Sequence, residues 1–278
     1  MSSSEKISPT AYATGYFWYR HGLSHVALAT PQGRRLDRAF GALIAATRLL
    51  SGISLEAMML ARHQGIDALL ARAIDEGRVA QVVELAAGLS ARGWRFKRRY
   101  GARLTYIETD LPAMVATKKN LLEQGGLLSA GHRVVELDAR ADGGERSLAG
   151  VMKTLDPKAG TVVITEGLMN YLDPETARGV WRRIAQNLAR FPQGQYLADA
   201  YFTSERRSAA MLAFGAILSV FVRGRMHVHF ASAQQAVALM QESGFRNAAV
   251  HETAALPETR AISRTPGADR VRILEAIS

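Results

Sequence analysis

The feature that most constrains the fold is an alternation of short β-branched runs with longer helical stretches, which begins near residue 81. The stretches between the first five runs can each hold a crossover helix. These five runs therefore predict a parallel sheet with helices on both faces, and two further runs in the tail bring the expected strands to seven. The runs are QVVEL from Gln81, RLTYIET from Arg103, RVVELDA from Arg133, TVVIT from Thr161, QYLADA from Gln195, NAAVHET from Asn247 and RVRILEAI from Arg270.

Two helices between and after these strands carry clear start signals. Asp173 precedes Pro174, and an Asp at the N-cap with Pro in the first helical position predicts a helix through DPETARGVWRRIAQNLARF. Ser232 and Gln235 have capping-box spacing, which predicts a second helix that ends near Gly244.

The first 80 residues hold helical patterns and no convincing strand, and no low-complexity linker follows them. We therefore expect one domain over residues 1–278. The expected parts are a helical cap at 1–80, a cofactor-binding core at 81–202, an inserted lid at 203–231 and a C-terminal helix with strands at 232–278. The lid rests on the apolar run from Ala209 to Val222, which is shorter than the roughly 20 residues of a membrane span. A plain core helix explains that run equally well.

Composition excludes several kinds of chemistry. The chain has no cysteine, which removes disulfides, thiolate catalysis and cysteine metal sites, and favours a reducing compartment. Its polar first residues, MSSSEKISPT, do not resemble a secretory signal. We therefore expect a cytoplasmic protein without a membrane partner.

The formal charge of +10 raises nucleic-acid binding as an alternative function. The cations are scattered, however, and the densest patch, at Arg95, Lys97, Arg98 and Arg99, is equally typical of a solvated helix end. A non-enzymatic binding protein of this kind would show salt-sensitive affinity for nucleic acid. We expect no nucleic-acid partner.

The segment VVELAAGLSARGW, which begins at Val82, runs from a strand through small residues into a helix. Folds that bind nucleotide-like cofactors use such a junction, because small residues let the ligand approach backbone N–H groups. The strict GxGxxG pattern is absent: Ala86 stands in the first glycine position, and Gly88 and Gly93 remain. A tight turn without a ligand explains the glycines as well. An NAD-dependent dehydrogenase would show the cleaner pattern, so this alternative is disfavoured.

Acidic residues lie at or near the ends of successive strands. The second strand ends in Glu108 and Asp110, and a carboxylate there can accept both hydroxyl hydrogens of a ribose. The alternative is that Asp110 caps the helix that starts near Pro112. The neighbouring strands place Glu84, Asp138 and Glu166 at comparable positions.

Four motifs, in this order and spacing, resemble the leucine carboxyl methyltransferase family, which includes bacterial polyketide O-methyltransferases. The resemblance covers roughly residues 55–190. It implies a class I S-adenosylmethionine-dependent methyltransferase with a Rossmann-like, doubly wound, mostly parallel seven-stranded sheet. The implied reaction is O-methylation of a small molecule, and carboxylate and hydroxyl acceptors both stay open. The motifs are QVVELAAGLSARGWRF, YIETDLP, ELDAR and VVITEGLMNYLDPETA.

The resemblance also implies a donor site. Arg62 matches the arginine that meets the donor carboxylate, a role that suits its bidentate guanidinium, and Asp110 matches the ribose-binding acid. The cofactor-binding candidates, from resemblance or from their place at strand ends, are Arg62, Glu84, Ala86, Gly88, Glu108, Asp110, Asp138, Ala139 and Glu166.

The acceptor pocket is expected between the N-terminal segment and the lid. A lysine that follows a Gly-Tyr pair in some family members is missing after Gly15 and Tyr16, and Arg20 is the best substitute. The acceptor candidates are Tyr16, Tyr19, Arg20, Tyr171 and Tyr201.

No catalytic residue is assigned, and no metal is expected. Methyl transfer from a sulfonium relies on positioning, and an ionised carboxylate acceptor needs no base, whereas a hydroxyl acceptor does. His227 and His229 have the period-two spacing of a metal pair, but no third ligand is evident nearby.

Overall fold

The computed structural model describes residues 9–203 and 226–278. Most of the expected lid, residues 204–225, lies outside the described residues. The chain divides into two compact units, residues 1–41 with 80–156 (unit 1) and residues 42–79 with 157–278 (unit 2). The division falls inside the expected helical cap, and the single domain expected for 1–278 stays a prediction.

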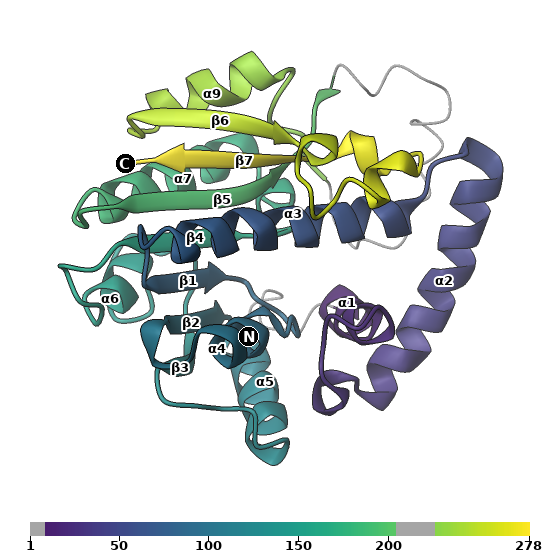
Figure 1. Cartoon of the computed structure of the whole chain (residues 1–278), viewed down its shortest axis with the longest axis horizontal. Helices are drawn as coiled ribbons and strands as arrows, with labels where there is room; N and C mark the ends of the chain where they lie inside the picture. Colours follow the sequence, from purple (N-terminus) through teal and green to yellow (C-terminus); the bar gives the residue numbers. More distant parts are fainter. Residues whose placement is uncertain (1–8, 204–225) are drawn as a thin grey trace. The chain divides into compact units, whose positions relative to one another are not determined.

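Unit 1 contains three parallel strands in the order β3-β2-β1 (Figure 1). Gln81 of β1 lies opposite Thr105 of β2, and Tyr106 lies opposite His132 of β3. An apolar cluster that includes Leu28, Leu89 and Leu122 connects the N-terminal helices with the helix after β2. The elements are α1 (Pro9–Arg20), η2 (Val26–Leu28), the start of α2 (Pro31–Ser51), β1 (Gln81–Leu85), α4 (Arg92–Tyr100), η3 (Gly101–Arg103), β2 (Thr105–Asp110), α5 (Pro112–Gln124), β3 (His132–Glu136) and α6 (Leu148–Met152).

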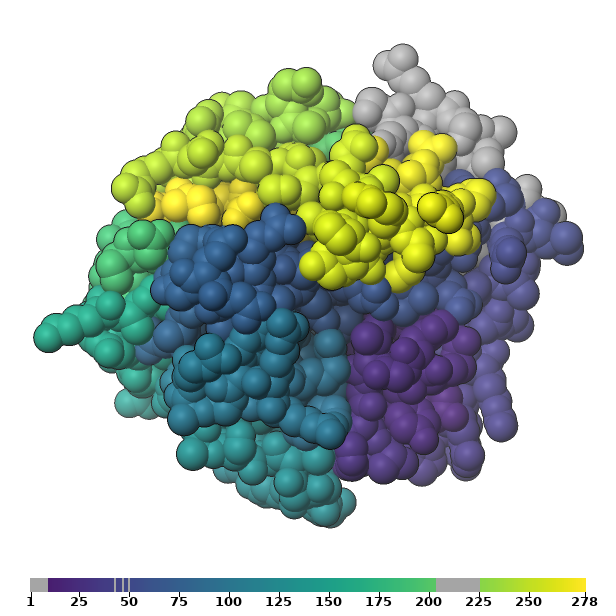
Figure 2. Space-filling model, in the orientation of Figure 1, coloured from purple at the N-terminus to yellow at the C-terminus, as the bar shows by residue number. Residues whose placement is uncertain are grey.

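Unit 2 contains four strands in the order β4-β5-β7-β6. β4 and β5 are parallel, whereas β7 runs antiparallel to both β5 and β6. The last three 3-10 turns lie against α3. In Figure 2 the yellow segment adjoins blue atoms. The elements are the end of α2, α3 (Leu55–Asp75), β4 (Thr161–Thr165), η4 (Met169–Tyr171), α7 (Pro174–Leu188), β5 (Gly194–Ala200), α9 (Ala233–Glu242), β6 (Asn247–Glu252), η6 (Thr253–Ala255), η7 (Ile262–Arg264), η8 (Ala268–Arg270) and β7 (Arg272–Ile277).

Close packing joins α3 to the strands of unit 2. A Cβ added to Gly65 would lie 2.7 Å from Cγ1 of Ile273, so the helix needs a glycine where it meets β7. On α7, the buried Trp181 donates its indole N–H to the hydroxyl of Tyr196 at 3.3 Å. That hydroxyl also bonds Thr165 at 2.7 Å, so α7, β4 and β5 share one buried polar junction.

All seven predicted strands are present, and they make the mostly parallel, mixed sheet of a Rossmann-like α/β fold. The helical character of the first 80 residues is confirmed for residues 9–80, which contain helices and turns. The second strand begins at Thr105, later than the β-branched run suggested, because residues Gly101–Arg103 form a 3-10 turn.

The helix start signals are confirmed. Asp173 accepts the N–H groups of Glu175 and Thr176, both at 3.0 Å, at the start of α7. Ser232 accepts the N–H of Gln235 at 3.3 Å, while the Gln235 side chain bonds Ala231 instead of completing the capping box at the Ser232 N–H.

In residues 9–203 and 226–278, no helix has both the length and the apolar character to cross a membrane.

Candidate functional site

The turn that follows β1 has left-handed backbone geometry. Ala86 and Gly88 have φ values of 51° and 48°. Glycine adopts this region without strain, whereas alanine places its Cβ too close to the following carbonyl. Ala86 therefore adopts the backbone region that favours the glycine missing from the sequence pattern, and it bears the strain.

Asp110 holds this turn. Its Oδ2 accepts the backbone N–H of Gly88 at 2.8 Å, and its Oδ1 accepts the N–H of Leu111 at 2.8 Å. The N-cap of α5 is Leu111 and has no side-chain cap, so the helix-capping alternative for Asp110 is wrong. A carboxylate has about four acceptor sites, and these N–H groups occupy two of them.

The protonation of Asp110 reflects two opposing effects. Burial raises the pKa of its carboxyl, while the N–H groups of Gly88 and Leu111, and the charge of Lys118, lower it. Burial is the larger effect, and the pKa is raised above the ordinary value of an aspartate.

Glu84 and Glu108 engage partners within unit 1. The 2% exposed Glu84 pairs with Arg92 and accepts the hydroxyl of Tyr106 at 2.6 Å. Glu108 is 1% exposed and contacts Nζ of Lys118 at 2.8 Å and Nε2 of His132 at 3.0 Å. The structure thus brings neither carboxylate to the turn that Asp110 holds.

Asp138 and Ala139 follow β3. Asp138 forms a bidentate pair with Arg140, with distances of 3.0 Å to Nε and 2.9 Å to Nη2. Asp138 and Ala139 are both half-buried and therefore partly accessible to solvent.

In unit 2, the candidates Arg62 and Glu166 meet directly. Nε of Arg62 donates to Oε1 of Glu166 at 3.0 Å, and Nη1 lies 3.5 Å from the hydroxyl of Tyr201. Arg62 comes from α3, Glu166 follows β4 and Tyr201 follows β5, so the fold gathers three predicted residues at the carboxyl ends of two parallel strands.

Three further residues complete what we call the Arg62 cluster: His63, Gly167 and Asp199. Nδ1 of His63 lies 2.8 Å from Oε2 of Glu166, and Oδ2 of Asp199 lies 3.7 Å from Nη1 of Arg62. Gly167 donates its N–H to Oδ1 of Asp199 at 2.8 Å. The predicted site residues did not include these three, although Asp199 closes the fifth strand, beside the expected acceptor pocket.

Burial and charge act against each other in the Arg62 cluster. Burial lowers the pKa of Arg62, but Tyr201, Glu166 and Asp199 outweigh it and raise the pKa, so the guanidinium stays charged. Burial raises the pKa of Asp199, opposed by Arg62, and it also raises the pKa of Tyr201. Arg62 is thus a permanent cation and Tyr201 a neutral hydroxyl at physiological pH.

The acceptor candidates divide between the units. In unit 1 the rings of Tyr16 and Tyr19 lie 5.8 Å apart, and Nε of Arg20 lies 3.3 Å from Asp37. In unit 2, Tyr171 is 43% exposed, whereas Tyr201 contacts Arg62.

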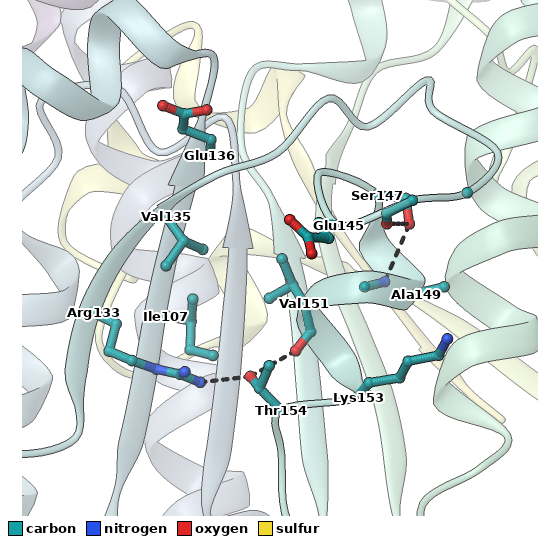
Figure 3. Close-up of a pocket in the computed structure, with 13 residues that line it drawn as sticks. Ile107, Arg133, Val135, Glu136, Glu145, Ser147, Ala149, Val151, Lys153 and Thr154 are labelled. Carbon is teal, nitrogen blue, oxygen red and sulfur yellow. Dashed lines mark hydrogen bonds between the residues drawn. The ribbon is translucent and has the colours of Figure 1, made fainter.

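A cavity of about 610 Å³ opens in unit 1 beside α6 (Figure 3). Ile107, Val135 and Val151 line its apolar part, and Arg133 donates to Thr154 at 2.8 Å along its wall. None of the predicted site residues lines this cavity.

The side chain of His229 is engaged elsewhere. Nε2 of His229 bonds the carbonyl of Met169 at 2.8 Å, and its ring centroid lies 6.3 Å from that of His227. Within the described part of the chain, no three His, Asp or Glu side chains are grouped to hold a metal ion.

Comparison with known proteins adds a family match. The family model described as leucine carboxyl methyltransferase matches residues 27–185. A Frankia alni protein named "Putative S-adenosyl-L-methionine-dependent methyltransferase" is 33% identical over 158 residues, and this match covers 55% of the chain and 53% of that protein. The chain thus spans about half the length of this relative.

Solved structures share the fold. A DUF574 family protein from Streptomyces avermitilis has a TM-score of 0.66 at 13% identity, over 98% of this chain and 97% of that one. Human N-acetylserotonin methyltransferase, solved in complex with SAM, has a TM-score of 0.50 at 15% identity, over 96% of this chain and 64% of that one.

Proposed function

The chain belongs to the leucine carboxyl methyltransferase family, and from this premise we propose that it transfers a methyl group from S-adenosylmethionine to an oxygen of a small molecule. The observation that carries the proposal is the bond from Gly88 to Asp110, which joins the turn after β1 to the acid that ends β2. A carboxylate fixed in this way, with about two acceptor sites left, suits the two hydroxyls of a ribose.

Arg62 is proposed to bind the carboxylate of the donor. Its Nε is bonded to Glu166, which fixes the plane of the guanidinium. An arginine fixed in one plane loses little side-chain freedom when it binds a carboxylate through paired N–H groups. Glu166 is then a residue of the donor site that also orients Arg62.

The remaining cofactor roles follow the family pattern. Ala86 and Gly88 keep the backbone approachable, and Asp138 with Ala139 is assigned to the adenine side. We give Glu84 and Glu108 a supporting role, because their carboxylates have partners inside unit 1.

The acceptor is proposed to be a small-molecule carboxylate or hydroxyl, polyketides included, with Tyr16, Tyr19, Arg20, Tyr171 and Tyr201 as candidates for its binding. A carboxylate would need positioning alone, whereas a hydroxyl would need a base. An assay that measures transfer of a labelled methyl group to matched acids and phenols distinguishes a carboxylate acceptor from a hydroxyl acceptor. We place the reaction in the cytoplasm, without a nucleic-acid or membrane partner.

Calorimetry tests the donor. We expect the protein to bind S-adenosylmethionine and S-adenosylhomocysteine and to leave NAD unbound. Binding of NAD alone would support a dehydrogenase and overturn the proposal. Salt-sensitive binding of nucleic acid without binding of either sulfur compound would overturn it in favour of a binding protein.

A further inference from the structure

Asp199 carries a buried carboxylate oxygen that lacks a donor. Its side chain is 4% exposed, and Oδ1 accepts the N–H of Gly167. Oδ2 has no hydrogen-bond partner among the described residues, although it faces Nη1 of Arg62 at 3.7 Å. A buried polar atom of this kind is costly unless water or a bound ligand supplies the missing donor.

The Arg62 cluster has too little positive charge to neutralise the carboxylate of Asp199. Oε1 of Glu166 accepts a hydrogen bond from Nε of Arg62, and Oε2 is hydrogen-bonded to Nδ1 of His63. Arg62 is the one permanent cation of the cluster, set against the carboxylates of Glu166 and Asp199. The cluster therefore favours a ligand that brings a positive charge to Asp199.

We propose that Asp199 binds the α-ammonium group of the methyl donor, beside Arg62, and so makes the Arg62 cluster specific for an α-amino acid. The inference rests on the proposed function. An α-amino acid carries an ammonium and a carboxylate on one carbon, so its complement is a carboxylate and a guanidinium side by side. Asp199 and Arg62 have this arrangement, at 3.7 Å.

Gly167 places no side chain against the guanidinium of Arg62. A Cβ at this position would lie 3.3 Å from Nη1 of Arg62, tighter than ordinary van der Waals contact. The φ of 66° also favours glycine here. The same residue thus fixes Asp199 through its N–H and leaves space at the atom that faces Asp199.

The test compares three ligands by calorimetry: S-adenosylhomocysteine, its deaminated analogue and 5′-methylthioadenosine, which lacks the amino acid. Wild type should bind S-adenosylhomocysteine at least about tenfold more tightly than the deaminated analogue, because a hydrogen bond between charged groups is lost. Asp199→Asn should weaken S-adenosylhomocysteine binding about ten- to hundredfold. The same variant should leave the affinities for the other two ligands within about twofold, since neither ligand has an ammonium group to bind at position 199.

Asp173→Asn is the matched control, because it removes one aspartate charge from unit 2 while the amide still caps α7. It should bind all three ligands like wild type. Equal affinity of wild type for S-adenosylhomocysteine and its deaminated analogue overturns the role of Asp199, and this comparison does not depend on the folding of a variant. Binding of none of the three ligands would instead overturn the proposed function, and the inference with it.

Discussion

Asp110 accepts the backbone N–H of Gly88 at 2.8 Å, so the acid that ends β2 holds the turn that follows β1. One carboxylate thus has a structural role and, in the proposed function, a ligand role. Experiments on Asp110 must separate the stability of the turn from the binding of the donor.

Asp110→Ala should weaken the binding of S-adenosylhomocysteine by about 1.5–3 kcal/mol, since hydrogen bonds to a charged acceptor are lost. Asp110→Asn retains one oxygen and should lose less. Calorimetry gives the affinity and thermal unfolding gives the stability. Glu123→Gln, an exposed glutamate of α5, serves as the control. If Asp110→Ala binds S-adenosylhomocysteine normally but has a lowered melting temperature, Asp110 stabilises the turn and does not bind the donor.

Arg62→Lys should weaken donor binding about tenfold, because an ammonium cannot make the paired N–H contacts of a guanidinium. Arg72→Lys, at an exposed position of the same helix, should bind the donor like wild type. If both variants keep full affinity in titrations with S-adenosylhomocysteine, Arg62 does not belong to the donor site.

Ala86→Gly should raise the free energy of unfolding by about 0.5–1 kcal/mol, since glycine relieves the left-handed strain but costs some entropy. Ala87 is outside the left-handed region and buried, so Ala87→Gly should instead destabilise by about 0.5–1 kcal/mol. Urea unfolding of the two variants should therefore give opposite signs. Destabilisation by both would show that the turn does not strain Ala86.

Glu108→Gln should lower the stability at pH 7 by about 3–5 kcal/mol, because Lys118 keeps a buried charge without its partner. Burial raises the pKa of Glu108, but Lys118 and His132 outweigh it, so the net pKa is lowered from 4.5. A lowered pKa gives stability that is complete above the unfolded value and is lost as pH falls through the folded value. Denaturation at several pH values should show the gap between wild type and variant narrowing below about pH 4.5. A gap that stays constant down to pH 2 would contradict this pH dependence.

Much of the fold could be predicted from the sequence, because β-branched runs and helix caps are local signals. QVVEL and TVVIT coincide with β1 and β4, and Asp173 caps α7 as expected. The antiparallel placement of β7 between β5 and β6 is a long-range pairing, which no local pattern encodes.

The candidate site could be predicted only in part. The acids near strand ends could be found in the sequence, but the residues that pack on each carboxylate could not. A Cβ on Gly93 would lie 2.8 Å from Cδ of Glu108, so α4 lies directly on this carboxylate. His63 and Glu166 are 103 residues apart, and neither carries a local sign of the contact.

Glu84 and Glu108 are direct partners in the β1–β2 register, and their counterions come from outside these two strands. A slip of β2 by one residue would turn Glu108 to the opposite face of the sheet, where Val83 and Ile107 are fully buried. A carboxylate would then be buried among apolar side chains, away from Lys118 and His132. The buried ion pairs thus favour the native register, because any pairing of β1 and β2 shifted by one residue is less stable.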